Sequence, residues 1–236
     1  MSGGNKTDAW RLFPENPLFR SPMKVLLTSG ATREPIDAVR FVSNVSTGAT
    51  GAALADALAA AGHEVTLLHG EGAVRPCRDG VVCGAFGSTA HLGERLRSAL
   101  AGGAYGAVIQ AAAVSDYRPD TEHAGKLSSH ADELALRLVP TPKLLPLIKS
   151  WSPRPLRVLG FKLTHGADEA ARVAAVGKLF SAGGVDAAVH NDLLEMHSTG
   201  AGRTFRIFRP GEAAEAVKFT GVPALCAWVA GWVAEA

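Results

Sequence analysis

Short aliphatic runs alternate with helix-forming stretches along most of this chain, and this alternation constrains the fold more than any other feature. The expected strands are residues 24–28, 63–68, 81–86, 107–112, 156–163 and 187–190, and the expected helices are residues 48–61, 89–100, 141–151, 168–182 and 222–234. Strands that are separated by helices pair in parallel, with helices on both faces. The predicted fold class is therefore α/β, a doubly wound, mostly parallel Rossmann-like sheet.

Residue types at the segment ends support these bounds. Ser88 is a favoured N-cap, Pro142 suits the first turn of a helix, and Gly62 stands where a helix C-terminal glycine belongs. Residues 29–47 are polar and are expected to form a long loop. Residues 205–208 and 216–219 predict a small antiparallel extension at the sheet edge.

Composition limits the size and the class of the protein. The chain has 236 residues, 47% of them apolar and 19% charged, so we expect an N-terminal arm (1–22) and one α/β domain (23–236). A formal net charge of +2 argues against nucleic acid or a membrane as a general partner. The N-terminus lacks the apolar region of a secretory signal and no window is long and apolar enough for a membrane span, so a cytoplasmic location is expected.

Cysteine and histidine show no metal-ligand spacing. Cys77, Cys83 and Cys226 are expected to be reduced, semi-buried thiols, because they are odd in number and form no C-x-x-C pair. The eight histidines are scattered along the chain. We therefore expect no metal site built from side chains alone.

The stretch Thr47-Gly48-Ala49-Thr50-Gly51 looks like the glycine loop of a dinucleotide-binding domain. That fingerprint needs its glycines directly after a strand, whereas Gly48 lies twenty positions after Thr28, where the first strand ends. The acidic residue expected after the second strand is also missing, since Glu71 comes late, and no Tyr-x-x-x-Lys pair follows. An NAD(P)-dependent Rossmann reductase remains an alternative.

Two loops instead have the composition of a phosphate site. Ser46, Thr47 and Gly48 place hydroxyls and backbone N–H groups at a helix N-terminus, where anions bind. The loop that begins with Ser29 and Gly30 adds hydroxyls and a guanidinium, and both loops leave the same end of the sheet. Each loop by itself could hold only capping and turn residues, but the two together favour phosphate binding.

Six ordered blocks identify a family. They are TSGATREPIDAVRFVSNVSTG, AAAVSDYRP, GKLSS, TPKLL, GFKL and HND. From about Lys24 to the C-terminus the chain resembles phosphopantothenoylcysteine synthetase, also called phosphopantothenate–cysteine ligase. GFKL and KLLPLIKSWSP are most similar to the stand-alone bacterial form, without a flavin-dependent decarboxylase domain.

The resemblance implies a ligase of coenzyme A biosynthesis. Its substrates would be 4′-phosphopantothenate, L-cysteine and a nucleoside triphosphate, usually CTP but otherwise ATP, with Mg²⁺ and with neither flavin nor NAD. The carboxylate would become an acyl-nucleotidylate with release of pyrophosphate, and the cysteine amine would then form the amide. Family members work as homodimers in which the segment after the catalytic lysine, here about 127–138, aids assembly. Alternating Leu134, Leu136 and Leu138 are typical of a pairing strand.

The resemblance also implies site residues. Lys126 matches the catalytic lysine and Asn44 the asparagine that contacts the acyl intermediate. The nucleotide-binding residues, taken from the resemblance and the two phosphate loops, are Ser29, Gly30, Ser46, Thr47, Gly48, Ala111, Ala112, Ala113, Asp116, Phe161 and Lys178. By chemistry, Arg33 and Arg40 are candidates for the substrate phosphate, because guanidinium binds phosphate bidentately. Each of these residues could instead have an ordinary structural role, in a turn, on the surface or in the core.

Several lysines of the family pattern are absent. The lysine of its serine-glycine loop is here Ala49, two lysines after Lys126 are Ser128 and Ser129, and a helix lysine is Ala182. Fewer cations would weaken triphosphate binding. A non-catalytic nucleotide-binding relative is therefore the further alternative.

Overall fold

The computed structural model describes residues 22–128, 133–197, 202–211 and 217–235; the expected N-terminal arm, except for its last residue, lies outside them. The central strands are β1 (Lys24–Ser29), β4 (Glu64–Gly70), β5 (Val82–Phe86), β6 (Ala107–Gln110), β9 (Arg157–Thr164) and β10 (Ala187–Asp192). These six pair in parallel, and β11 (Thr204–Phe208) and β12 (Val217–Thr220) extend the sheet antiparallel at one edge. The order in the described sheet is β12-β11-β10-β9-β6-β1-β4-β5, which confirms the expected fold class.

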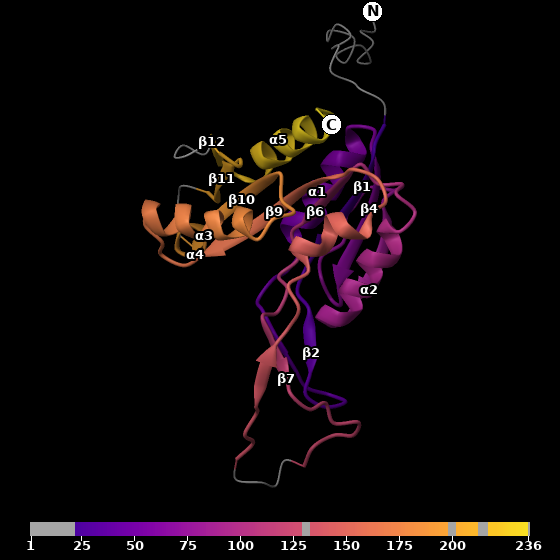
Figure 1. Ribbon diagram of the computed structural model, residues 1–236, viewed down its shortest axis with the longest axis vertical. Coiled ribbons are helices and arrows are strands. Elements are labelled where there is room, and N and C mark those ends of the chain that lie inside the picture. Colours follow the sequence, from indigo (N-terminus) through magenta and orange to yellow (C-terminus); the bar gives the residue numbers. More distant parts are fainter. Residues whose placement is uncertain (1–21, 129–132, 198–201, 212–216, 236) are drawn as a thin grey trace, which may run out of the picture.

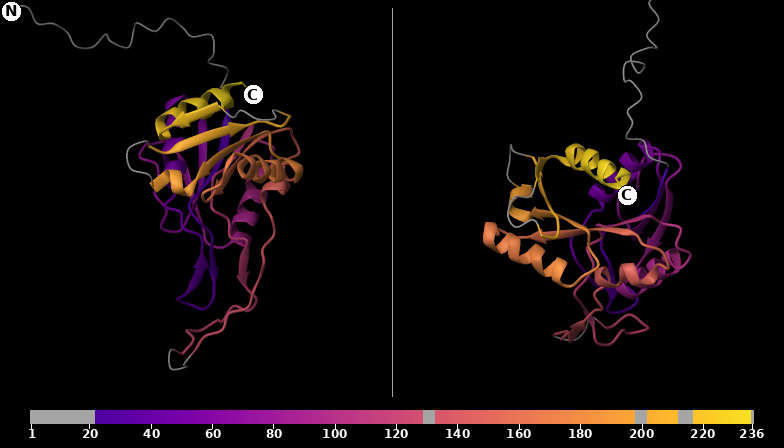
Figure 2. Two further views of the ribbon diagram at one scale, coloured as in Figure 1. Left: turned by 90° about the vertical axis from the view of Figure 1, so that its left-hand side faces the viewer. Right: turned by 45° about the horizontal axis from the view of Figure 1, so that its top comes forward.

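Helices cover both faces of this sheet (Figures 1 and 2). α1 (Ala49–Ala60) and α5 (Val222–Ala234) pack on the face that buries Val25 and Leu27. α2 (Thr89–Leu100) and the 3₁₀ helix η1 (Leu145–Trp151) pack on the face that buries Leu26. Val25, Leu26 and Leu27 are all buried although they face different clusters, so the middle of β1 is a continuous apolar run.

Local chemistry sets the helix ends as expected. Ser88 caps α2 by accepting from the backbone N–H of His91 at 3.2 Å. Asp168 caps α3 (Glu169–Ser181) in the same way through Ala171. Gly62 follows α1 with φ 86°, a left-handed conformation that glycine adopts without strain. A short helix, α4 (Leu193–His197), follows β10.

Two antiparallel strand pairs project from the sheet beyond the carboxyl ends of its parallel strands (Figure 1). β2 (Arg33–Pro35) pairs with β3 (Phe41–Ser43), so the segment expected to be only a loop contains a hairpin. β7 (Tyr117–Pro119) pairs with β8 (Leu138–Pro140). Of the three alternating leucines only Leu138 lies in a strand, because β8 begins at that residue.

Three further expectations were wrong in detail. The helix expected from Pro142 begins only at Leu145, because the hydroxyl and N–H of Thr141 bond to the carbonyls of Ser115 and Asp116. β6 ends at Gln110, two residues early. The cysteines are not uniformly semi-buried: Cys226 is buried in the core, whereas Cys77 and Cys83 are exposed.

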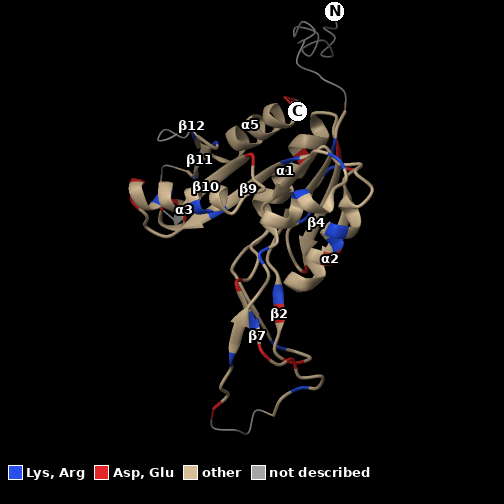
Figure 3. Cartoon of the chain, in the orientation of Figure 1, with Lys and Arg blue, Asp and Glu red and all other residues tan. Residues whose placement is uncertain are grey.

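Charged residues of both signs are interspersed along the described chain (Figure 3). Within that part of the protein, no helix is long and apolar enough to cross a membrane.

Candidate functional site

A backbone cradle forms where β1 ends and α1 begins. Gly30 and Gly48 have φ values of 78° and 77°. A Cβ on Gly48 would lie 2.9 Å from the Cβ of Ala73 and 3.2 Å from the nitrogen of Gly30, and a Cβ on Gly30 would lie 2.7 Å from the same Ala73 atom. The close approach of these chain segments therefore requires glycine at both positions.

The cradle has the unused polar groups of an anion site. The N-cap residue of α1 is Gly48, which has no side chain to cap the helix, and the first turn has no acidic residue. The hydroxyl of Ser29, 1% exposed, has no hydrogen-bond partner in the described residues, and it lies 3.3 Å from where a Gly48 Cβ would be. Thr47 accepts from the N–H of Ala49 at 3.3 Å, and Ser46 is partly exposed beside it. A phosphate bound here would supply the missing acceptors.

The expected nucleotide-contacting alanines lie directly beside this cradle. The N–H of Ala113 donates to the carbonyl of Gly30 at 2.7 Å, and the carbonyl of Ala113 accepts from Thr32 at 3.2 Å. Ala111 and Ala112 are held by Thr28, through its carbonyl and hydroxyl respectively. All three alanines are partly exposed, so their small side chains leave a surface at the end of β6.

Asn44 joins the same region. Its side chain is exposed, and Nδ2 donates to the carbonyl of Val114 at 3.2 Å, one residue beyond Ala113. The structure therefore brings Asn44 together with Gly30 and Ala113, although the three come from different loops.

Lys126 is exposed, but both of its neighbours are fixed. The carbonyl of Gly125 accepts from Ala38 at 3.5 Å, and the N–H of Leu127 donates to Asp37 Oδ2 at 3.0 Å. Arg40 Nη1 donates to the carbonyl of Leu127 at 3.3 Å. These contacts attach the lysine segment to the β2–β3 turn.

Asp37 is the centre of that attachment, and its side chain is fully buried. The N–H of Val39 is the largest influence on its pKa; although burial opposes it, this bond and those from Leu127 and Arg40 lower the pKa to about 2. Arg40 pairs with this carboxylate at 2.5 Å. The structure thus gives Arg40 a role in loop geometry that the sequence did not indicate, and its phosphate role remains a prediction.

Arg33 lines an open cleft of about 460 Å³ between the β2–β3 hairpin and the start of α2. Its guanidinium stacks on Phe41, 4.7 Å from the ring centre, and lies 3.6 Å from the Glu71 carboxylate. Glu71 is the acidic residue that a reductase would use to bind the ribose of a nicotinamide cofactor. In this structure its carboxylate instead faces the guanidinium of Arg33.

Asp116 is exposed at the start of β7 and forms an ion pair with Lys143. Lys143 was not singled out from the sequence, although it stands within the quoted TPKLL block. Exposed pairs of this kind contribute little to stability, so the carboxylate can exchange partners at low cost.

Two expected residues lie apart from the cradle. Phe161 is partly buried on β9 and packs against the core. Lys178 is exposed in the last turn of α3, whereas the first turn of that helix lies at the carboxyl edge of the sheet. No contact among the described residues joins Lys178 to the cradle, so its role remains a prediction.

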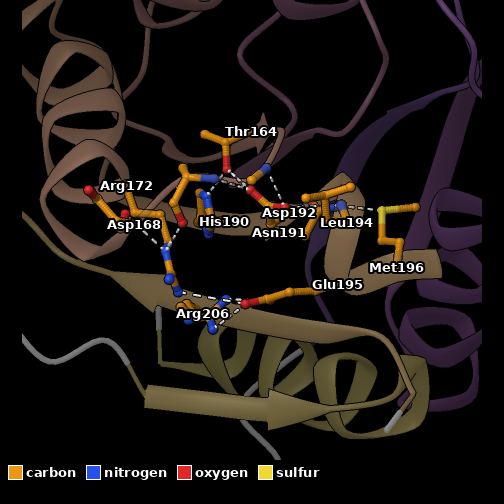
Figure 4. A network of polar contacts seen from close by, with 12 residues as sticks. Thr164, Asp168, Arg172, His190, Asn191, Asp192, Leu194, Glu195, Met196 and Arg206 are labelled. Carbon is orange, nitrogen blue, oxygen red and sulfur yellow. Dashed lines mark hydrogen bonds and ion pairs between the residues drawn. The ribbon is translucent and has the colours of Figure 1, made fainter. Parts of the chain in front are cut away.

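A buried polar network organises the carboxyl ends of β9 and β10 (Figure 4). Burial opposes ionisation of Asp192, but the Thr164 hydroxyl and three backbone N–H groups outweigh it and hold its pKa well below the usual range. Thr164 donates to Asp192 and must therefore accept from Nε2 of His190, 2.8 Å away. Arg206 and Arg172 flank the network and pair with Glu195.

The protein has a doubly wound α/β sheet with an uncapped helix and a glycine cradle at its carboxyl edge, an arrangement that is typical of α/β proteins that bind phosphate groups. The family model described as "DNA/pantothenate metabolism flavoprotein C-terminal domain" matches residues 21–214, so the chain belongs to this family. The family resemblance drawn from the six sequence blocks is thereby confirmed.

Curated relatives agree with this assignment. The chain is 35% identical over 170 residues to the coenzyme A biosynthesis bifunctional protein CoaBC of Thermococcus kodakarensis, covering 72% of this chain and 41% of that protein. It is 39% identical over 121 residues to the protein of the same name from Mycolicibacterium smegmatis, covering 50% of this chain and 28% of that protein. The chain thus spans about two fifths or less of the length of these relatives.

Solved structures share the fold. The DNA/pantothenate metabolism flavoprotein of Streptococcus pneumoniae is 25% identical, with a TM-score of 0.77, and covers 88% of this chain and 96% of that one. A Cab2 mutant in complex with phosphopantothenate-cysteine is 19% identical, with a TM-score of 0.70. The match covers 90% of this chain and 88% of the Cab2 chain. The second likeness is one of fold alone.

Proposed function

We propose that this protein is a phosphopantothenate–cysteine ligase. The observation that carries the proposal is the convergence of the glycine cradle and Asn44 on one loop, where Ala113 bonds to Gly30 and Val114 bonds to Asn44. If the cradle binds phosphate, this arrangement would put the phosphate and an amide donor side by side. Family membership and the names of the curated relatives support the same activity.

The first half-reaction joins a carboxylate to an α-phosphate. An oxygen of the 4′-phosphopantothenate carboxylate attacks the α-phosphorus of the triphosphate, the α–β bridging bond breaks, and pyrophosphate leaves. Both reactants are anionic, so cations and backbone donors must neutralise charge as they approach. The cradle of Ser29, Gly30 and Gly48 would hold the phosphates, and Lys126 would stabilise the charge that develops on them.

The second half-reaction forms the amide. The cysteine amine attacks the activated carbonyl, the C–O bond to the nucleotide breaks, and the nucleoside monophosphate leaves with that oxygen. Asn44 would donate from Nδ2 to the carbonyl oxygen as it gains negative charge. Arg33, at the open cleft, would bind the phosphate of the substrate, with Arg40 beside it.

We further propose CTP as the co-substrate, with Mg²⁺ bound mainly through the triphosphate oxygens. The described residues contain no cluster of three histidine, cysteine, aspartate or glutamate side chains that could hold a metal ion. Magnesium commonly keeps several waters and binds through substrate phosphates, so it does not require a cluster of protein ligands. Asp116 would exchange Lys143 for the ribose hydroxyls, and Phe161 would lie beside the base.

A cytoplasmic homodimer completes the proposal. Exposed apolar side chains lie on the two projecting strand pairs and on the segments that adjoin them: Val39, Phe41, Leu134, Leu136 and Leu138 are 40–60% exposed. Burial of such residues against a second copy would remove apolar surface from water. Light scattering of the wild type and of Leu136→Asp measures the assembly: we expect a dimer for the wild type and dissociation for the variant.

The activity test is pyrophosphate release by the full chain with phosphopantothenate, cysteine and Mg²⁺, comparing CTP with ATP. Release that requires phosphopantothenate and falls at least a hundredfold in Lys126→Gln supports the ligase. No release with either nucleotide, from a folded protein, would leave the alternative of a non-catalytic nucleotide-binding relative.

A further inference from the structure

A guanidinium reaches the first turn of α1 from a distant part of the chain. Arg203 precedes β11, and its Nη1 donates to the hydroxyl of Thr50 at 2.6 Å, across 153 positions of sequence. Thr50 is the second residue of α1, immediately after the Gly48 cradle and Ala49. β11 runs antiparallel to β10, and Arg206 lies opposite His190 near the carboxyl end of β10. The start of β11, which precedes Arg206, therefore lies at the carboxyl edge of the sheet.

This contact places two positive groups beside each other. The N-terminus of α1 carries partial positive charge and has neither a side-chain cap nor an acidic residue in its first turn. Within the part of the chain that the structure describes, Thr50 is the only hydrogen-bond partner of the Arg203 side chain, and no carboxylate pairs with it. An anion that bridged both groups would replace repulsion by attraction.

A second observation at the same helix end also indicates a ligand. The Ser29 hydroxyl is 1% exposed, has no partner among the described residues, and lies 3.3 Å from the Cβ position of Gly48. Buried hydroxyls are nearly always hydrogen-bonded, so this one indicates a missing ligand.

We propose that Arg203 binds the polyphosphate chain of the nucleoside triphosphate, together with Ser29 and the first-turn N–H groups of α1. The inference rests on the proposed ligase function. Guanidinium presents several N–H donors in a fixed plane, so Arg203 can keep Thr50 with one donor and offer others to phosphate oxygens. Arg203 thereby supplies a cation next to Ala49, a position that carries none.

The test compares ligands that differ only in their phosphates. Calorimetry on the full chain with Mg²⁺ would give the dissociation constants of the nucleoside triphosphate that supports turnover, of its monophosphate, and of inorganic tripolyphosphate. In Arg203→Gln we expect triphosphate and tripolyphosphate to bind about 10- to 100-fold more weakly, as for the loss of a charge-assisted hydrogen bond. The monophosphate should bind as before, within about twofold.

Two variants serve as controls. Arg209→Gln removes the same charge just beyond the other end of β11, where the side chain is 46% exposed, and should change none of the three constants. Arg203→Lys keeps the charge but loses the planar fork, and should recover part of the triphosphate affinity.

Unchanged triphosphate binding in Arg203→Gln would overturn the inference. Equal weakening of triphosphate and monophosphate would also overturn it, because it would indicate general damage to the site. Wild-type turnover tests the ligase separately: if the wild type makes product and Arg203→Gln keeps its nucleotide KM, only the role of Arg203 fails.

Discussion

The backbone N–H of Leu127 donates to the buried carboxylate of Asp37 at 3.0 Å, and this bond fixes the residue that follows Lys126. The preceding residue, Gly125, accepts from Ala38. Lys126 is thus a long, exposed side chain on a fixed backbone. Holding a catalytic group in position contributes strongly to the rate of many enzymes, because moving such a group by about 1 Å can slow the reaction about a hundredfold.

Replacing Asp37 should therefore slow the reaction without unfolding the protein. Asp37→Asn keeps the shape of the side chain but replaces one acceptor oxygen by an NH₂ group. We expect kcat to fall about 10- to 100-fold. Hydrogen exchange in the absence of ligands should quicken in residues 123–127 and stay slow in β1.

Asp120→Asn is the matched control, because Asp120 is an exposed carboxylate that pairs with Arg137 at 3.5 Å on the neighbouring strand pair. It should leave both the rate and the exchange unchanged. Faster exchange in Asp37→Asn with an unchanged kcat would show that Lys126 does not need a fixed backbone.

Gly48→Ala should cost stability and nucleotide affinity together. A left-handed conformation costs a residue with a Cβ about 1–2 kcal/mol, and the new Cβ would lie 2.9 Å from Ala73. Gly62→Ala has the same backbone requirement, with φ 86°, but meets nothing within 4 Å.

Urea titration and nucleotide binding would separate the two effects. Gly62→Ala should lose about 1 kcal/mol of unfolding free energy and keep its nucleotide KM. Gly48→Ala should lose more and bind nucleotide at least tenfold more weakly. Similar nucleotide affinity in the two variants would mean that the cradle does not hold the phosphates.

Asn44→Ala should abolish most of the activity at little cost to the fold. The side chain is exposed, and its described contact is one hydrogen bond to Val114. Loss of that bond costs about 1 kcal/mol or less, whereas loss of a donor to a developing oxyanion costs about 10²–10³ in kcat. Thermal melts and the rate of phosphopantothenoylcysteine formation measure the two quantities, and a kcat within threefold of wild type would exclude Asn44 from the chemistry.

His190 should make stability depend on pH. Burial, with help from Arg206 and Arg172, lowers its pKa from 6.5 to about 4. Between pH 6.5 and 4 the unfolded chain binds a proton that the folded chain does not, so the free energy of unfolding should fall as pH is lowered through this window. The pKa values of Asp192 and Glu195 are lowered in the folded protein, so these carboxylates add to the same loss of stability at the acidic end of this window.

Urea titrations at several pH values would measure this dependence. His190→Gln should show a shallower loss of stability between pH 6.5 and 4, whatever its stability at neutral pH. The same slope in both proteins would mean that His190 is not the group responsible.

Much of the fold could be predicted because apolar periodicity and local caps determine it. The parallel strands, the Ser88 cap and the edge hairpin follow from patterns within short windows. The β2–β3 hairpin could not be predicted in this way. It is held by tertiary contacts, such as the Glu34 carboxylate accepting from Thr89 at the start of α2, and these leave no local pattern.

The residues of the candidate site also fall into those that local sequence patterns predict and those that only tertiary contacts reveal. Ser29, Gly30, Gly48 and the three alanines that follow β6 stand in motifs whose chemistry can be read locally, and the structure brings them together. Asp37 was missed although it stands inside a quoted block, because an aspartate in a turn is commonplace. Only its burial and its bond to Leu127 distinguish it.

The most direct test of the ligase follows one oxygen atom. With 4′-phosphopantothenate labelled with oxygen-18 in its carboxylate, attack at the α-phosphorus and release by cysteine should leave one labelled oxygen in the nucleoside monophosphate and none in pyrophosphate. Mass spectrometry of the products of a single incubation would measure it. Label in the monophosphate, alongside phosphopantothenoylcysteine, is the result we expect; label in orthophosphate, or no amide product from the folded protein, would contradict the acyl-nucleotidylate mechanism.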